Sequence, residues 1–497
     1  MASGEQNQKN SQPTIVSPTA IPAGEQRLFT LSEFRRELGV PLILAKKLIV
    51  WGEVEAEWAL DGTLRITTTE LLAAKELVMH PRRKLRLFLR ALGPGLVTGA
   101  SDDDPGGIGT YSSVGARFGL AIIWMALWLL PVMLAVQEAC ARIGIVTNRG
   151  LADVLRQHYA KQVVTVATLL LIVANIANIG ADLGAMAAVT QMSTGLNFYF
   201  SAVVFALIIL LLEVFVKYHT YVKFLKWLTV SLFAYVITGF IVHPAWGEVF
   251  NFALLPHVEN SQAYVFAMIA VFGTTISPYL FFWQTSEEVE EGKLVHAKCD
   301  PCTVHDRMGK MRNDVGIGML FANIAFFFIV LTTTQVFFKN GIYDIGSAEE
   351  AALALRPLAG DYAYLLFSLG IIGTGLLGIP VLAGSGAYAL SEVLKWREGL
   401  ELKLSRAKGF YAVIAFSILV GLLLNFLGIN PISALYWSAF LNGVIALPLL
   451  FLIMIAGDNK KIMGDETHPI WVRIFGWLAI FFMTMALLTM LFMKVIF

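Results

Sequence analysis

Apolar residues fill most of the chain beyond Pro81 in long runs, and short polar stretches separate these runs. A helix rises about 1.5 Å per residue, so about 20 apolar residues cross a hydrocarbon layer of about 30 Å. The pattern predicts eleven spans, at residues 85–117, 120–141, 163–187, 197–216, 224–243, 262–286, 314–337, 363–391, 409–427, 432–456 and 469–496. It therefore indicates an all-α membrane protein, with residues 82–497 as an eleven-span domain.

The residues before Pro81 show a different pattern. Residues 1–24 are polar and lack the apolar core of a signal peptide, which predicts a disordered tail. Residues 25–81 predict a small cytoplasmic domain, with amphipathic helices at 31–38 and 42–50, a turn at Asp61-Gly62 and a helix that begins at Thr68. This order is faintly like a winged helix, and a docking or regulatory appendage is the simpler interpretation. Its basic residues form no stripe, so we expect no nucleic-acid partner and leave its partner open.

Two of the predicted spans are interrupted at their centres. Residues 102–104 are three consecutive aspartates, and residues 105–107 are Pro-Gly-Gly, which does not continue a helix. Residues 272–279 place Gly, Thr, Ser and Pro in the middle of the sixth span. Carboxylates beside a helix broken at membrane depth are typical of a cation site between two such helices. A loop outside the membrane and a simple proline kink are the alternative interpretations of the two breaks.

The basic residues orient the spans. Lys and Arg beyond Pro81 concentrate in alternate connecting segments, and the remaining segments hold only Arg117, Lys339, Arg356 and Lys494. By the positive-inside rule, the N-terminus is cytoplasmic and the C-terminus lies outside the inner membrane. Spans one and six then cross in opposite directions, five spans apart, as in an inverted repeat of five helices plus an eleventh span.

Composition narrows the class of protein. The chain is 57% hydrophobic and 15% charged, which excludes a soluble enzyme with a large core. Three cysteines imply no disulfide framework, and the sequence has no phosphate-binding loop of the P-loop type. We therefore expect neither covalent catalysis nor a cofactor nor an ATP-driven pump. The expected partners are the lipid bilayer and a transported ion.

Several motifs resemble the Nramp family of divalent metal transporters, from about Gly93 to the C-terminus. The resemblance rests on the break in span six and on the segments at residues 93–96, 104–106, 141–147 and 151–153. It implies a LeuT-like fold, in which the unwound parts of spans one and six hold the central metal ion.

The chain departs from the usual family pattern at the expected site. Gly107 stands in place of an Asn ligand and Ser277 in place of a Met thioether. Tyr279 and Gln284 replace two histidines, and Asn175 and Ala185 replace two carboxylates linked to proton movement, whereas Asp182 remains. This combination is similar to the Nramp-related magnesium transporter branch.

The oxygen-rich set that remains is suited to hard cations. Without a thioether, carboxylate, hydroxyl and carbonyl oxygens favour Mg²⁺ and Mn²⁺, and Mg²⁺ usually keeps several waters. The expected metal-site residues are Asp104 as the main ligand, Ser101 through its carbonyl, Asp103, Thr274 and Ser277, with Gly107 leaving room for water. Asp102, Asp182 and Asn442 are expected directly behind the ligands or along the ion path. Pairing of Asp182 with Asn178 or a hydroxyl, and a packing role for Asn442, are the alternatives.

We therefore expect a transporter of Mg²⁺, and also of Mn²⁺, that works by alternating access. None of the eight histidines falls in the middle of a predicted span, which argues against tight proton coupling. One alternative is a proton-coupled Mn²⁺/Fe²⁺ carrier. Another is a receptor that senses divalent ions and signals through the N-terminal domain. A sodium-coupled amino-acid carrier is disfavoured, because the aspartates at 102–104 would repel a substrate carboxylate.

Three polar features lie towards the cytoplasmic ends of the spans. Glu138 and Arg142 are spaced for an i,i+4 ion pair. The four glutamates at 287, 288, 290 and 291 are interpreted as a solvated helix end, with attraction of leaving cations as the alternative. His296, Cys299, Cys302 and His305 have the residue types of a zinc site, but a mobile loop with free thiols is the preferred interpretation.

Overall fold

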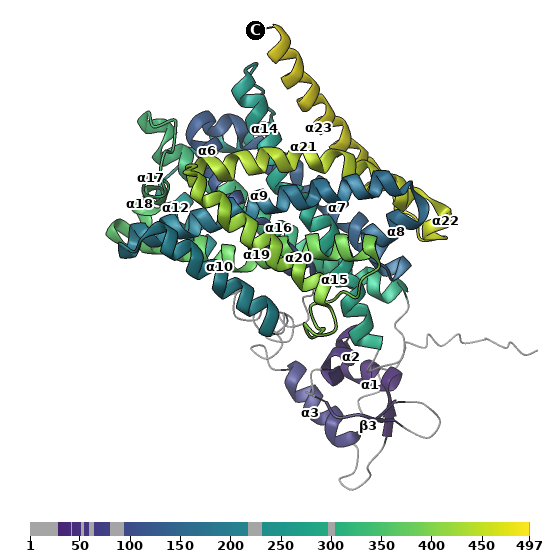
Figure 1. Ribbon diagram of the computed structural model, residues 1–497. Coiled ribbons are helices and arrows are strands. Elements are labelled where there is room, and N and C mark those ends of the chain that lie inside the picture. Colours follow the sequence, from purple (N-terminus) through teal and green to yellow (C-terminus); the bar gives the residue numbers. More distant parts are fainter. Residues whose placement is uncertain are drawn as a thin grey trace, which may run out of the picture. The chain divides into compact units, whose positions relative to one another are not determined.

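The computed structural model describes residues 28–40, 42–50, 54–58, 64–79, 94–216, 231–296 and 304–496. It divides into two compact units, Met1–Leu89 and Arg90–Phe497 (Figure 1). The expected tail at 1–24, the Asp61-Gly62 turn, and Cys299 and Cys302 all lie outside the described residues.

The N-terminal unit combines three short strands with three helices. Its strands pair antiparallel in the order β1-β3-β2, and Phe29 of β1 faces Ile66 of β3 in the register. The elements follow one another as β1 (Leu28–Thr30), α1 (Leu31–Leu38), α2 (Leu42–Val50), β2 (Glu57–Trp58), β3 (Leu64–Thr67) and α3 (Thr68–Met79). The three helices expected from the sequence are confirmed.

Local signals define the ends of α1. Thr30 and Glu33 form a reciprocal capping box at its N-terminus, and Gly39 closes it with a left-handed φ of 64°. The apolar faces of the helices and of β1 and β3 then share a small core, which is formed by Phe29, Phe34, Leu38, Ala45, Leu48, Val54, Ile66, Leu71 and Ala74.

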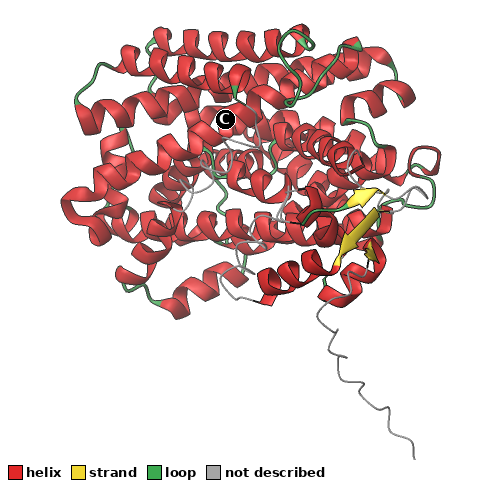
Figure 2. Ribbon diagram, turned by 90° about the horizontal axis from the view of Figure 1, so that it is seen from below, coloured by secondary structure: helices red, strands yellow, loops and turns green. Residues whose placement is uncertain are grey.

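Among the described residues, the second unit contains helices and connecting loops but no strand, and the strands of the N-terminal unit are yellow in Figure 2. Its helices are α5 (Pro94–Asp102), α6 (Pro105–Phe118), α7 (Trp124–Thr147), α8 (Leu151–His158), α9 (Lys161–Thr194), α10 (Phe198–Phe215), α12 (Phe233–Ile241), α13 (Trp246–Leu254), α14 (Gln262–Thr275), α15 (Pro278–His296), α16 (Val304–Val336), α17 (Ala348–Ala352), α18 (Arg356–Ala359), α19 (Ala363–Leu394), α20 (Lys408–Leu424), α21 (Pro431–Asp458), α22 (Lys460–Met463) and α23 (Ile470–Ile496).

Nine helical segments among the described residues are long and apolar enough to cross a membrane. They correspond to nine of the eleven expected spans. The expected first span is present as the pair α5 and α6, and the fifth is represented by α12, with residues 217–230 outside the described part.

Burial separates central helices from peripheral ones. The apolar window of the α14–α15 segment is 89% buried, whereas those of α10 and α23 are 28% and 22% buried. Apolar side chains that face outward are stable only against lipid or another apolar partner, so α10 and α23 lie at the lipid-facing periphery. The interrupted sixth span lies at the centre, in contact with α21, α6 and α19.

Candidate metal site

The break between α5 and α6 follows from three backbone groups. A continuous helix would bond the carbonyls of residues 101–103 to the amides of residues 105–107. Pro105 has no N–H group, so the Ser101 carbonyl loses its partner. The Gly106 amide donates instead to Asp182 Oδ1 at 3.1 Å, and the Gly107 amide donates to Asp104 Oδ1 at 2.7 Å. Asp104, with φ −63° and ψ 174°, is therefore the N-cap of α6.

The break between α14 and α15 uses the same chemistry. Pro278 has no N–H group, so the carbonyl of Thr274 loses its helical partner. The Ser277 hydroxyl lies 2.7 Å from the Gly273 carbonyl and 3.0 Å from the Thr274 carbonyl, and it donates to them. Its hydrogen therefore closes α14, while its oxygen lone pairs stay available. The expectation that both spans are interrupted at these positions is confirmed.

The fold brings the two breaks together. Tyr279, in the first turn of α15, donates its phenol hydrogen to the Ser101 carbonyl at 2.8 Å and lies 3.4 Å from Asp104 Oδ2. A Cβ on Gly107 would lie 3.4 Å from the Thr274 hydroxyl and 3.0 Å from the Asp102 carbonyl. The break of the first span therefore lies against the break of the sixth span, with Tyr279 beside Ser101 and Gly107 beside Thr274.

Three consecutive aspartates are fully enclosed at this point. Asp102, Asp103 and Asp104 are 1%, 0% and 2% exposed. All four carboxylate oxygens of Asp102 and Asp103 lack a hydrogen-bond partner, and no ion pair among the described residues includes any of the three aspartates. Buried carboxylates are costly without a partner, so the arrangement is complementary to a cation or to its water shell.

Asp182 and Asn442 are both buried beside the broken helices. Asp182 anchors the first turn of α6 through Gly106, and its Oδ2 has no partner. The alternative of a bond from Asp182 to Asn178 or to a hydroxyl is wrong, because a backbone amide is its partner. Asn442 lies on α21, is 1% exposed and has an unpartnered Oδ1, and its neighbour Gly443 packs against Gly273.

Two contacts of this site were missing from the sequence interpretation. Tyr279 was noted only as a replacement, although its phenol joins the two breaks. Gly378 of α19 approaches Asp104 so closely that a Cβ would lie 3.0 Å from the Asp104 Cβ. The signal available in the sequence is the run of glycines at 370, 373, 375 and 378, which permits close helix packing in membranes.

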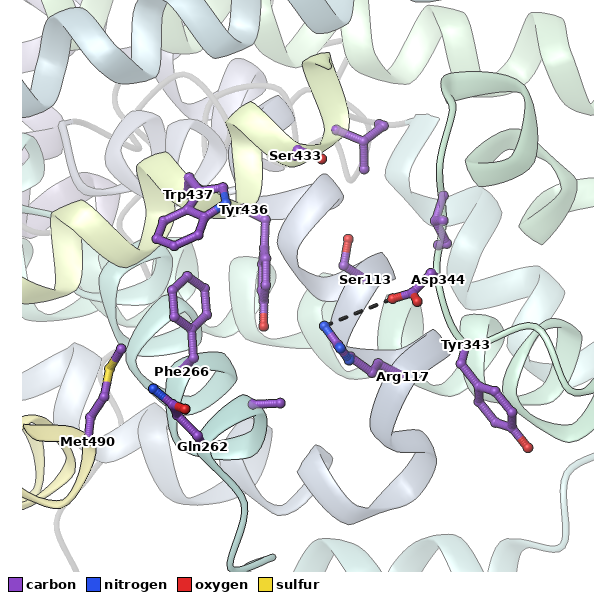
Figure 3. Close-up of a pocket in the computed structure, with 13 residues that line it drawn as sticks. Ser113, Arg117, Gln262, Phe266, Tyr343, Asp344, Ser433, Tyr436, Trp437 and Met490 are labelled. Carbon is purple, nitrogen blue, oxygen red and sulfur yellow. Dashed lines mark ion pairs between the residues drawn. The ribbon is translucent and has the colours of Figure 1, made fainter. Parts of the chain in front are cut away.

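A separate cavity of about 550 Å³ lies between the C-terminal half of α6 and the N-terminal turns of α14 and α21 (Figure 3). Arg117 and Asp344 point towards each other at its wall, 3.9 Å apart, and Phe266 and Trp437 form an aromatic wall. Ser113 lines this cavity, and Gly109, one turn closer to Asp104 on α6, packs directly against Leu435 of α21. Along α6, the contact between Gly109 and Leu435 therefore lies between the cavity-lining Ser113 and Asp104.

The glutamates that begin at residue 287 differ from expectation. Glu287 and Glu288 are 5% and 6% exposed, so the interpretation as a solvated helix end is wrong for them. Glu290 accepts hydrogen bonds from the Tyr388 phenol at 2.6 Å and from the Leu400 amide at 3.2 Å. The segment that follows α19 covers this end of α15, which the local sequence does not show.

The expected pair of Glu138 and Arg142 is confirmed, with an N–O distance of 2.9 Å. Arg312 of α16 also binds Glu138, at 3.0 Å, so the pair joins α7 to α16.

Asn175, where the resemblance implies a carboxylate, donates to the Leu382 carbonyl and to Ser385 and so links α9 to α19.

No group of three or more His, Cys, Asp or Glu side chains in the described part of the chain is placed to hold one metal ion together. An ion near Asp104 would therefore have at most one further ligand of these types among the described residues, and it would take the rest from hydroxyl groups, carbonyl groups or water. The zinc hypothesis for the loop at 296–305 depends on two cysteines that lie outside the described residues.

Comparison with known proteins decides the family. Residues 95–493 match the family described as natural resistance-associated macrophage protein-like, or Nramp. The chain belongs to the Nramp family. It is accordingly a multi-pass membrane transporter and not an enzyme. The magnesium branch within this family stays a prediction.

Individual relatives agree with the family assignment. The chain is 27% identical over 411 residues to the divalent metal cation transporter MntH of Klebsiella pneumoniae subsp. pneumoniae, covering 80% of this chain and 91% of the relative. It is 25% identical over 406 residues to MntH of Clostridium acetobutylicum, covering 80% and 89%.

Solved structures show the fold. A manganese transporter of Eremococcus coleocola superposes with a TM-score of 0.65 at 17% identity, covering 82% of this chain and 87% of that one. MhsT in complex with L-phenylalanine superposes with a TM-score of 0.52 at 13% identity, covering 81% and 98%. The expected LeuT-like fold is confirmed, with α5–α6 and α14–α15 as its two interrupted spans.

Proposed function

We propose that this Nramp protein transports divalent metal cations, Mg²⁺ and with it Mn²⁺, by alternating access and without tight proton coupling. The observation that carries the proposal is the enclosed group Asp102, Asp103 and Asp104, of which two carboxylates have no protein partner. The relatives named as divalent metal cation transporters support the charge of the ion.

The donor atoms around Asp104 support a hard ion. Carboxylate, hydroxyl and carbonyl oxygens surround the point where the breaks meet, and Ser277 offers a hydroxyl where the resemblance implies a thioether. Oxygen ligands suit Mg²⁺ and Mn²⁺, and Mg²⁺ keeps water when few protein ligands are available. We propose Asp104 as the principal ligand, with Thr274 and Ser277 as oxygen donors and Asp103 as a further carboxylate of the site.

The proposed driving force is the ion gradient and the membrane potential. A divalent ion that moves inward at −100 mV gains roughly 2 × 2.3 kcal/mol, so accumulation requires no coupled proton. We also propose a location in the inner membrane, with the N-terminus in the cytoplasm and the C-terminus outside, from the distribution of Lys and Arg.

The alternative of a proton-coupled Mn²⁺/Fe²⁺ carrier requires a substitute for the missing soft ligand. Met186, one turn from Asp182 on α9, is a candidate for this ligand. A Cβ on Gly375 would contact both the Met186 sulfur and the Pro105 ring, so the sulfur lies near the start of α6. Met186→Leu conserves the side-chain volume and removes the sulfur. Unchanged Mn²⁺ uptake in this variant supports the oxygen-only site, whereas a selective loss of Mn²⁺ uptake supports the alternative.

The decisive experiment is uptake by the purified full-length protein in proteoliposomes, with Mg²⁺, Mn²⁺ and Ca²⁺ offered separately and internal pH recorded. We expect Mg²⁺ uptake, competition of excess Mg²⁺ with Mn²⁺, and no stoichiometric acidification. Mn²⁺ uptake with stoichiometric acidification would refute uncoupled transport. Failure of Mg²⁺ to compete would refute the magnesium assignment.

The N-terminal unit offers a test of the receptor alternative. Residues 28–79 have their own apolar core, and their winged-helix-like character remains our proposal. Deletion of residues 1–80 is expected to leave uptake kinetics unchanged in proteoliposomes. Loss of uptake would contradict a separable docking or regulatory role for this unit.

A further inference from the structure

Tyr279 occupies the point where the two interrupted spans meet. Its side chain is 1% exposed, and it extends from the first turn of α15 towards α5. The phenol oxygen lies 2.8 Å from the Ser101 carbonyl and 3.4 Å from Asp104 Oδ2. The shorter contact is a hydrogen bond of ordinary length, so the phenol hydrogen points mainly to Ser101.

This bond competes with the ion for one candidate ligand. The Ser101 carbonyl lacks a helical partner because Pro105 has no N–H group, and a free carbonyl at a broken helix is suited to bind a cation. Tyr279 donates to one of the two lone pairs of that carbonyl oxygen, which weakens the carbonyl as a ligand. The Gly107 amide takes Asp104 Oδ1, which leaves Oδ2 as the carboxylate oxygen beside the phenol.

The bond also orients the phenol oxygen. A phenol has one hydrogen to donate, and its oxygen can accept as well. With the hydrogen on Ser101, the lone pairs face away from that carbonyl, and Asp104 Oδ2 is 3.4 Å from the same oxygen. A water molecule on an ion beside Oδ2 has O–H groups to donate, and the phenol oxygen is an acceptor within reach of it.

We propose that Tyr279 recognises the hydration shell of the transported ion. It competes with the ion for the Ser101 carbonyl and offers its own oxygen to an ion-bound water, so that the site prefers an ion that keeps its water. This inference rests on the proposed transport of divalent cations at Asp104. It assigns to Tyr279 a specificity role that the aspartates alone do not supply, because a carboxylate binds a stripped or a hydrated ion.

The test is the substitution Tyr279→Phe, which removes the acceptor and releases the Ser101 carbonyl. The matched control is Tyr264→Phe on α14, which likewise removes buried phenol contacts to backbone carbonyls, at 2.7 Å from Ala121 and 2.6 Å from His257, away from the aspartates. KM and kcat for Mg²⁺ and for Mn²⁺ are measured in proteoliposomes for the wild-type protein and both variants.

We expect Tyr279→Phe to raise KM for Mg²⁺ relative to KM for Mn²⁺ by about three- to tenfold, the range of one hydrogen bond. Mn²⁺ is affected less, because it exchanges its water more readily and gains the released carbonyl. Tyr264→Phe leaves the ratio unchanged. An equal change for both ions in Tyr279→Phe would show a purely structural role and would overturn the proposal.

A second measurement does not depend on the variant. Hexaamminecobalt(III) presents N–H donors on a shell that it does not exchange, so it imitates a fully hydrated ion. We expect it to compete with Mg²⁺ at the wild-type protein, and absence of competition overturns the proposal. If the wild-type protein transports neither Mg²⁺ nor Mn²⁺, the proposed function itself fails, and that result is distinct from transport with an unchanged selectivity ratio.

Discussion

Asp104 has two roles that one substitution can separate. Its Oδ1 caps α6 through the Gly107 amide at 2.7 Å, and its Oδ2 is proposed to face the ion. Asn is as good an N-cap as Asp, so Asp104→Asn keeps the cap and removes the charge. Asp104→Ala removes both.

The structure gives a magnitude for each role. Loss of the cap in Asp104→Ala costs about 0.5–2 kcal/mol of stability, whereas Asp104→Asn stays within about 0.5 kcal/mol of wild type. Removal of the Asp104 charge weakens its bond to the ion or to an ion-bound water by about 1.5–3 kcal/mol of binding free energy, which is roughly ten- to 150-fold in affinity. We therefore expect Asp104→Asn to fold normally and to raise KM for Mg²⁺ by at least tenfold, and Asp104→Ala to abolish transport.

The assay pairs thermal unfolding in detergent with Mg²⁺ uptake in proteoliposomes, at equal amounts of reconstituted protein. The melting temperature reports the loss of the N-cap, and KM for Mg²⁺ reports the loss of the carboxylate charge. Uptake by Asp104→Asn with wild-type KM would refute Asp104 as an ion ligand. A large drop in melting temperature for the same variant would refute the separation of the two roles.

Three further predictions concern the scaffold and are checked by thermal unfolding. Gly273→Ala is expected to lower the free energy of unfolding by about 1–3 kcal/mol, because the added Cβ would overlap the α21 backbone. Gly247→Ala is the control, because a Cβ at that position would have nothing within 4 Å. Equal effects of the two substitutions would contradict the prediction. Asp182→Ala leaves the buried Gly106 amide without an acceptor and is expected to lower the free energy of unfolding by about 1–3 kcal/mol. Asp182→Asn keeps an acceptor for that amide. An equal loss of stability in both variants would contradict the prediction. Burial lowers the pKa of His468 from 6.5 to about 4, so the unfolded chain binds the proton more readily, and stability falls as pH drops from about 6.5 towards 4. His468→Asn is expected to flatten this decline in melting temperature, and an unchanged slope would contradict the cause.

Features governed by local chemistry were predictable from the sequence. Pro105 and Pro278 each remove one amide from a helix, so the interruptions follow from the residues themselves, wherever the helices lie. Helix lengths followed from apolar runs, and the pair of Glu138 and Arg142 followed from helical spacing. The expectation that 101–107 and 274–279 meet relied on the inverted repeat, which links positions far apart in the chain.

Features that depend on tertiary contacts were not predictable. Ser101 and Tyr279 are 178 residues apart, and nothing in either local sequence specifies that bond. The burial of Glu287 and Glu288 results from neighbouring helices and from the segment after α19, whereas their sequence alone is typical of an exposed helix end. The acceptor role of Asp182 likewise requires the first turn of α6 as its partner.

The first turn of α6 has a further consequence for substrate choice within this fold. The exposed amides at a helix N-terminus normally attract anions. Here the amides of Gly106 and Gly107 already bind the carboxylates of Asp182 and Asp104, so the protein fills its own anion site. In this chain the amides of that helix end are therefore both occupied and offer no free anion site to the carboxylate of a substrate.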